Sequence, residues 1–265
     1  MNWDTVINDN RGLIAYIFPV IGIVTLLASS EGVLPGFLSF NPWLLLFGIL
    51  VMRSPLLVGI APVMSKQFAI GLVFLTAYTY LIEYIGVLTG WPYGTFAYEI
   101  SLGPMIHGVP VALPILFLPL VVNAYLLGVL TFPDSQWQRV PFVIVAVIAM
   151  DVVLDPGAVS VGFWSYANPG FYGVAWTNFL GWFLSATVTV LILEHTVPYE
   201  ALYERLRSTP FILDDTVSFV LFWGGLNAVY QNEASFLLAC GFGLYLWYLN
   251  AFDMPSLANQ RWIFT

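Results

Sequence analysis

The sequence predicts an all-α fold, a polytopic membrane helix bundle of about eight transmembrane helices forming a single domain over residues 1–265. The chain is 60% hydrophobic and only 8% charged. Its apolar residues also gather in runs close to the ~20 residues that an α-helix needs to cross a bilayer. The runs cover residues 12–29, 42–63, 67–89, 105–130, 140–155, 172–195, 211–230 and 234–252.

The basic residues predict the orientation of this bundle. With a cytoplasmic N-terminus and eight helices, all seven basic residues fall in or beside cytoplasmic segments, whereas the opposite connections contain no Lys or Arg. The positive-inside rule therefore places both termini in the cytoplasm. The seven residues are Arg11, Arg53, Lys66, Arg139, Arg205, Arg207 and Arg261.

The second apolar run has two interpretations. Asn41-Pro42 is typical of a helix start, with Asn as the N-cap and Pro at the first helical position. Arg53-Ser54-Pro55 then interrupts the run. The run is either a short helix followed by an interfacial stretch, or a full span in which the Arg53 side chain snorkels inward.

Composition excludes several classes of function. Fifteen acidic against seven basic residues give a net charge of −8, which argues against a nucleic-acid partner and suits a high-salt cytoplasm. His107, His195 and the lone Cys240 are too few for a metal-ligand cluster or a disulfide framework. The sequence also contains no GxxxxGK[ST] or GxGxxG nucleotide motif. We therefore expect no metal and no cofactor.

Three carboxylic acids inside the predicted spans are the candidate catalytic residues, because ionisable side chains within a membrane are costly and usually functional. Glu83 lies seventeen residues beyond Lys66, which corresponds to roughly 25 Å along a helix. Asp151 lies twelve residues beyond Arg139, or roughly 18 Å. Both acids are therefore expected in the outer half of the membrane. The alternative for Glu83 is a structural hydrogen bond to a neighbouring helix.

Asp151 and Asp155 are spaced i, i+4 and share one face of a helix. Two carboxylates this close in a low dielectric repel each other, so we expect one of them to keep its proton. A neutral carboxylic acid of this kind could protonate an alkene. An alternative exists for Asp155, since Asp155-Pro156-Gly157 is also typical of a turn that ends a helix.

Aromatic side chains gather on the same side of the membrane as these acids. Trp91 and Tyr93 follow the third run, and Trp164 and Tyr166 follow the fifth. Such residues are typical of the interfacial aromatic belt. Beside buried acids, however, their π faces could stabilise a carbocation, so they are candidate substrate-binding residues.

Four more candidate binding residues come from helix faces. Asn178 and Trp182 share a face at the outer end of the sixth run, where an amide could bind a water molecule or hold a carboxylate. Gly86 and Gly90 follow Glu83 on one face of the third run. That glycine spacing predicts either close helix packing or a smooth groove for a flat polyene.

Three stretches of the chain carry a resemblance to a known family. They are EYIGVLTGWPYGTFAY (83–98), GVPVALP (108–114), and MDVVLDP (150–156) with its continuations GFWSY (162–166) and GVAWTNFLGW (173–182). Together they make about residues 70–185 resemble the carotenoid biosynthesis (CruF-type) hydratases. The family commonly has an aromatic residue where Val111 or Ala112 stands here.

The resemblance implies a multi-pass enzyme of the cell membrane that hydrates a terminal double bond of an acyclic carotenoid. The acidic composition is similar to that of haloarchaeal members, for which the family implies hydration of the terminal isopentenyl bonds in bacterioruberin synthesis. The implied partners are a carotenoid and membrane lipid, and the family context suggests association with other carotenoid-pathway enzymes.

Hydration of an alkene is redox-neutral, and the predicted roles follow from its chemistry. Asp151 or Asp155 would protonate the alkene to a tertiary cation, and Glu83 would handle the second proton, although these roles could be permuted. Trp91, Trp164 and Tyr166 would line the cation site, and Asn178 would position water.

Two alternative functions remain open at the level of sequence. In a membrane carotenoid cyclase an internal double bond would capture the same cation, but the chain has no Pro-x-Glu-Glu-type acidic motif. In a carotenoid-binding scaffold or a proton-coupled transporter the buried acids would bind or relay protons. Similarity between the two halves of the chain would support a transporter, and the sequence shows no such similarity.

Overall fold

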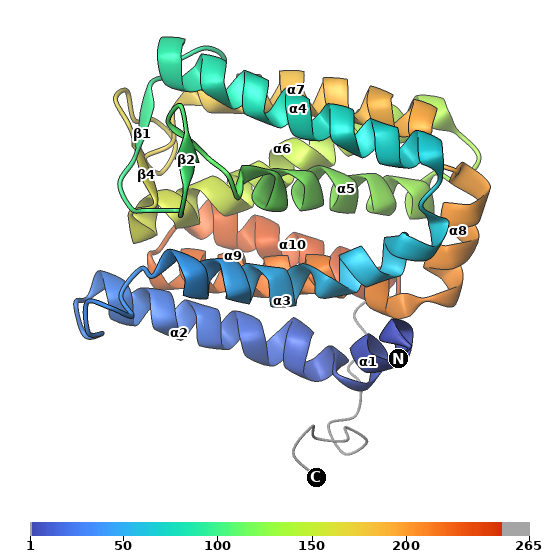
Figure 1. The fold of residues 1–265 in the computed structure, drawn as a ribbon, viewed down its shortest axis with the longest axis horizontal. Coiled ribbons are helices and arrows are strands. Elements are labelled where there is room, and N and C mark those ends of the chain that lie inside the picture. The colour runs from blue at the N-terminus through green and yellow to red at the C-terminus, as the bar shows by residue number, and fades with distance from the viewer. Residues whose placement is uncertain (1, 251–265) are drawn as a thin grey trace.

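A computed structural model describes residues 2–250 of the chain as a bundle of roughly antiparallel helices (Figure 1). Short strands gather at the end of the bundle opposite α1 and α8. The helices are α1 (Trp3–Asp9), α2 (Phe18–Ser30), α3 (Pro42–Ile60), α4 (Lys66–Thr89), α5 (Leu113–Thr131), α6 (Gln136–Val161), α7 (Trp176–Thr196), α8 (Tyr199–Ser208), α9 (Asp214–Val229) and α10 (Glu233–Tyr248). The strands are β1 (Phe96–Tyr98), β2 (Met105–Ile106), β3 (Val109–Pro110) and β4 (Trp164–Tyr166).

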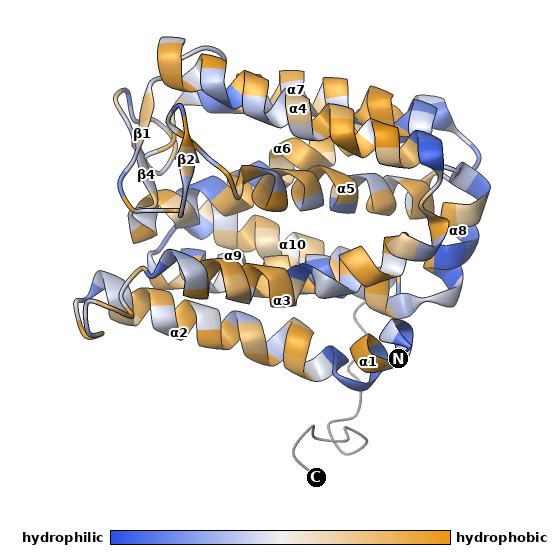
Figure 2. Ribbon diagram, viewed as in Figure 1, coloured by the Kyte–Doolittle hydropathy of each residue, from blue (hydrophilic) through white to orange (hydrophobic). Residues whose placement is uncertain are grey.

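The predicted fold class is confirmed. Seven helical segments in the described part of the chain are long and apolar enough to cross a membrane, and they match the first seven predicted runs. Hydrophobic residues dominate these segments, while hydrophilic ones collect around α1 and α8 (Figure 2). The eighth predicted run begins as α10, which has 16 residues. Residues 251–252 of that run, and Arg261, lie outside the described residues.

The fourth span begins later than predicted. Residues 105–110 form the hairpin β2–β3, in which Met105 pairs with Pro110. His107 and Gly108 at its tip have φ angles of 50° and 82°, as a two-residue hairpin turn requires. The apolar character of this stretch therefore reflects a small hairpin that precedes α5.

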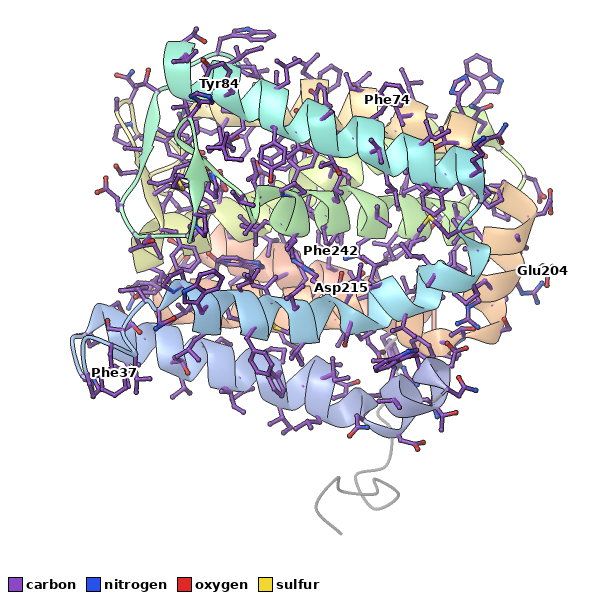
Figure 3. The ribbon with its side chains drawn as sticks, viewed as in Figure 1. Phe37, Phe74, Tyr84, Glu204, Asp215 and Phe242 are labelled. Carbon is purple, nitrogen blue, oxygen red and sulfur yellow. The ribbon has the colours of Figure 1, made fainter. Side chains whose placement is uncertain are left out.

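The second run is a full span of 22 residues, Pro42–Val63. The Asn41 side chain caps its start by accepting hydrogen bonds from the backbone N–H groups of Trp43 and Leu44. Arg53 does not break the helix. Its side chain is buried and its Nη1 lies 2.6 Å from Oδ1 of Asp215 in α9, and Asp215 lies inside the bundle (Figure 3).

Helix α6 continues through Pro156, so the turn considered for Asp155 does not form. Proline leaves the carbonyl four residues earlier without its helical donor. Here the Ser235 hydroxyl donates to the Val152 carbonyl at 2.7 Å, and the Asn227 amide donates to the Val153 carbonyl at 2.7 Å. Because α9 and α10 supply these donors, the helix reaches Val161 and presents Asp155 on a regular face.

The structure gathers the described basic residues toward one end. Arg205 on α8 pairs with Asp4 on α1, and Arg11, just after α1, pairs with Asp214 at the start of α9. Arg139 in the first turn of α6 pairs with Glu194 in the last turn of α7. Helices α1 and α8 lie at the end of the bundle away from the strands (Figure 1). The opposite end carries the two small sheets. This asymmetry is the one on which the predicted orientation rests, and the orientation itself stays a prediction.

Cysteine labelling tests that orientation. In a Cys240→Ser background, we expect Thr95→Cys, which is exposed at the strand end, to react with an impermeant maleimide applied outside intact cells. Ser208→Cys, exposed at the end of α8, should react only after lysis. The reverse pattern would invert the proposed topology.

Candidate active site

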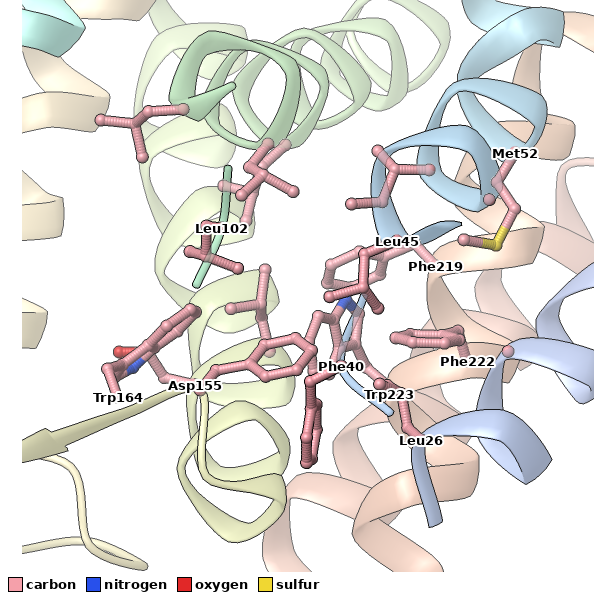
Figure 4. Close-up of a pocket in the computed structure, with 18 of the residues that line it drawn as sticks. Leu26, Phe40, Leu45, Met52, Leu102, Asp155, Trp164, Phe219, Phe222 and Trp223 are labelled. Carbon is pink, nitrogen blue, oxygen red and sulfur yellow. The ribbon is translucent and has the colours of Figure 1, made fainter. Parts of the chain in front are cut away.

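A cavity of about 500 Å³ runs through the bundle between α2, α3, α5, α6 and α9 and ends under the strands. Most of its wall is apolar. Asp155 and Trp164 lie on one side of it, whereas Leu26, Met52 and Phe222 lie on the other (Figure 4). The carboxyl groups that line it lie at the strand end, while the rest of the wall is mostly apolar and includes Arg53, which is paired with Asp215.

Two of the predicted acids face this polar end. Glu83 lies six residues before the end of α4, and Asp155 lies six residues before the end of α6, and both line the cavity. Because the two helices end on the same side of the bundle, equal spacing from their ends brings the two carboxyl groups to a similar depth. The structure therefore unites two acids that are 72 residues apart in the chain.

Asp151 lies behind the cavity wall, fully buried on α6. The Asn178 side-chain amide donates from Nδ2 to Oδ2 of Asp151 at 2.9 Å and to Oδ2 of Asp155 at 2.7 Å. The other oxygen of Asp151 has no hydrogen-bond partner among the described residues. One amide thus joins the two aspartates that the i, i+4 spacing placed on one helix face.

The sheet β1–β4 holds a tyrosine over each cavity acid. Its antiparallel register pairs Phe96 with Tyr166 and Tyr98 with Trp164, and these four rings share the inward face because side chains alternate along a strand. The Tyr98 hydroxyl donates to Glu83, and the Tyr166 hydroxyl donates to Oδ2 of Asp155 at 2.9 Å.

The tyrosines are fixed in the donor form. Burial raises the pKa of the Tyr98 hydroxyl well above its usual range, and the negative charge of Glu83 is the second largest cause. Burial also raises the pKa of the Tyr166 hydroxyl well above its usual range, and the negative charge of Asp155 is the second largest cause. Both hydroxyls therefore keep their protons at any physiological pH and donate hydrogen bonds to the acids.

Aromatic rings complete the walls at this end. Tyr93, Trp164 and Trp182, which are predicted to bind the substrate, line the cavity. The Trp182 ring stacks on Phe117, with centroids 4.9 Å apart and planes at 21°, and the Tyr93 hydroxyl is hydrogen-bonded to Ser185 at 2.7 Å. These contacts fix the ring orientations.

Three predicted binding residues lie off the cavity wall. The Trp91 side chain is 57% exposed. Gly90 ends α4 with a φ of 74°, a left-handed conformation that glycine adopts without strain. A Cβ at Gly86 would lie 3.4 Å from the Tyr93 ring, so this glycine admits a packing partner. Gly90 thus ends the helix and Gly86 allows close packing against Tyr93, while a part of either glycine in binding a polyene stays a prediction.

Sequence reasoning overlooked Tyr98 and Phe117. Tyr98 stands at the end of the first family-like stretch, two residues after Phe96, and this alternation could have shown that both face inward. Phe117 lies in a uniformly apolar run, so no local signal distinguishes it.

The site acids differ from the other buried acids in their partners. Asp214, Asp215 and Glu194 each pair with an arginine. Within residues 2–250, the ion pairs of the structure include none of Glu83, Asp151 and Asp155. Uncompensated carboxylates are very costly in a low dielectric, and ionisable residues kept within a membrane span are usually functional, so these three remain the candidate catalytic acids.

Comparison with known proteins places the chain. The model of the carotenoid biosynthesis protein family matches residues 40–246. The chain belongs to this family. It is also 49% identical to bisanhydrobacterioruberin hydratase from Haloarcula japonica over 263 residues, which cover 98% of this chain and 89% of that protein. The resemblance to carotenoid biosynthesis hydratases predicted from the sequence is thus confirmed. No solved structure matches the chain significantly.

Removal of the bridging amide tests the geometry of the site. Asn178→Leu keeps a similar volume but deprives two buried aspartates of a donor, so we expect the free energy of unfolding to fall by about 1–3 kcal/mol. Thr187→Val is the control on the same helix, because its hydroxyl bonds only to the Phe183 carbonyl at an exposed position. Equal stability of the two variants in detergent would contradict the bridge.

Proposed function

We propose that the chain is a hydratase that adds water to the terminal isopentenyl double bonds of an acyclic carotenoid, converting bisanhydrobacterioruberin to bacterioruberin in the cell membrane. The observation that carries the proposal is a pair of carboxyl groups, Glu83 and Asp155, at the polar end of a long apolar cavity. The name of the Haloarcula relative, bisanhydrobacterioruberin hydratase, supports the choice of reaction.

The hydrogen bonds suggest a division of roles between the two cavity acids. Asp155 accepts two donors on one oxygen, from Tyr166 and Asn178, and such donors favour the anion. Glu83 accepts one donor, from Tyr98. We therefore assign Glu83 as the general acid and Asp155 as the general base. Asp151 is a positioning residue, because it reaches the site only through Asn178.

The reaction then proceeds without a change of oxidation state. The O–H bond of Glu83 breaks, and its proton forms a C–H bond at the less substituted alkene carbon. The neighbouring carbon becomes a tertiary cation facing the rings of Trp164 and Tyr166. A water molecule forms the new C–O bond and gives its proton to Asp155. Return of that proton to Glu83 resets the site.

The apolar wall protects this intermediate. A tertiary cation is short-lived in bulk water, so the cavity must exclude water other than the one that reacts. The stacked pair Phe117 and Trp182 closes one side of the polar end. Tyr93, held by Ser185, closes another. The rigid rings thus determine both the position of the cation and the direction from which water attacks.

Substitution of the carboxyl groups tests the assignment. Purified Glu83→Gln and Asp155→Asn should each lose at least ~10²-fold in hydration rate, since amides preserve shape but cannot transfer these protons. Glu99→Gln is the control, because Glu99 contacts Ser165 on the outer face of the same sheet, and it should stay within about twofold. Near-normal rates in both site variants would exclude this site.

Deuterium exchange separates the acid from the base. In D₂O, Asp155→Asn should still protonate the alkene reversibly and so place deuterium in unreacted carotenoid. Glu83→Gln should incorporate none. The opposite pattern would exchange the two roles without removing the site.

A further inference from the structure

The cavity also reaches the side of the bundle. Three of its lining residues, Ile21 on α2 and Leu44 and Phe47 on α3, are 51%, 46% and 58% exposed on the outer surface. All three belong to membrane-spanning segments. The opening between these two helices therefore faces lipid rather than either aqueous phase.

Gly48 leaves space between α2 and α3. Gly48 of α3 lines the cavity, and a Cβ built there would meet no atom within 4 Å. The Phe18 and Phe47 rings bridge the two helices, with centroids 6.4 Å apart. We call the opening bounded by Ile21, Leu44, Phe47 and Gly48 the α2/α3 slot.

The size of the ligand requires such an opening. If the proposed function holds, the substrate is an acyclic polyene many times longer than the end group that reacts. A cavity of about 500 Å³ accommodates an end group and an adjoining part of the chain, within the range typical of small-ligand pockets. The rest of the polyene must leave the bundle through an apolar surface, because contact with water would be unfavourable.

We propose that the α2/α3 slot is a polyene-binding site and the lateral portal of the enzyme. The carotenoid enters from the bilayer with its end group first, and that end group reaches Glu83 and Asp155. The remaining polyene lies in the slot over Gly48 and extends into lipid between α2 and α3. This inference rests on the proposed function for the identity of the ligand and replaces the groove expected along Gly86 and Gly90.

A pair of glycine substitutions tests the portal. Gly48→Trp places an indole in the slot, whereas Gly241→Trp places one on α10, at a glycine whose Cβ position is equally open. With an acyclic carotenoid as the probe, the shift of its visible absorption on binding is titrated for each detergent-purified variant. We expect Gly48→Trp to weaken binding and lower the hydration rate by at least tenfold, and Gly241→Trp to change neither by more than twofold.

Chemical modification of the folded protein tests the portal without the risk that a substitution prevents folding. In the Cys240→Ser background, Leu44→Cys and Leu244→Cys are modified with a bulky maleimide, since both positions are exposed on helix surfaces. Modification at position 44 should abolish binding, and modification at position 244 should not. Equal binding by the two blocked proteins would overturn the portal.

The result that would contradict the proposed function differs from the result that would contradict the portal. If wild-type protein binds the carotenoid but forms no alcohol, the hydratase assignment is lost, while the comparison between positions 44 and 244 still decides the slot. If wild-type protein hydrates the carotenoid, and the proteins blocked at positions 44 and 244 do so at equal rates, the hydratase assignment stands and the portal is lost.

Discussion

The cost of placing an ionisable group in a low dielectric governs this structure. Elsewhere in the bundle the cost is met by pairing, as between Arg53 and Asp215, which join α3 to α9. Removal of either partner from such a pair would leave an uncompensated buried charge. At the strand end the acids instead receive neutral donors, from Tyr98, Tyr166 and Asn178. Ion pairs thus join helices elsewhere in the bundle, whereas the acids at the strand end have neutral hydrogen-bond donors.

The sheet formed by β1 and β4 lies over the end of the cavity that contains the acids. In a membrane protein, strands outside the spans have water on one side and the bundle on the other. Here β1 and β4 turn their aromatic side chains inward and leave Ala97 and Ser165 outside. The sheet therefore closes the cavity while it positions both tyrosine donors. A mostly apolar cavity with carboxyl groups at one end would suit a hydrocarbon chain that reacts at a terminal double bond.

Much of the fold could be predicted because hydropathy reports directly on membrane spans. The seven spans and the Asn41 cap follow from local sequence. The missed features depend on distant partners. Nothing near Pro156 indicates that Ser235 will satisfy the carbonyl it leaves free, and nothing near Arg53 points to Asp215, 162 residues away.

The site could be predicted in part for the same reason. The acids were identifiable because any buried carboxylate is unusual in a span. Which aromatic residues belong to the site was less predictable, because an interfacial belt and a cavity wall have the same composition. Only the register of β1 with β4 distinguishes Tyr98, which is inside, from Trp91, which is exposed.

The central claim is that water captures a cation formed by protonation from the carboxyl pair. Its most direct test is to incubate the purified protein with an acyclic carotenoid in ¹⁸O-labelled water, without oxygen or added cofactors, and to measure the mass of the product. The account predicts a tertiary alcohol that carries ¹⁸O in every newly formed hydroxyl group. A cyclised isomer of unchanged mass, or a hydroxyl oxygen derived from dioxygen, would contradict it.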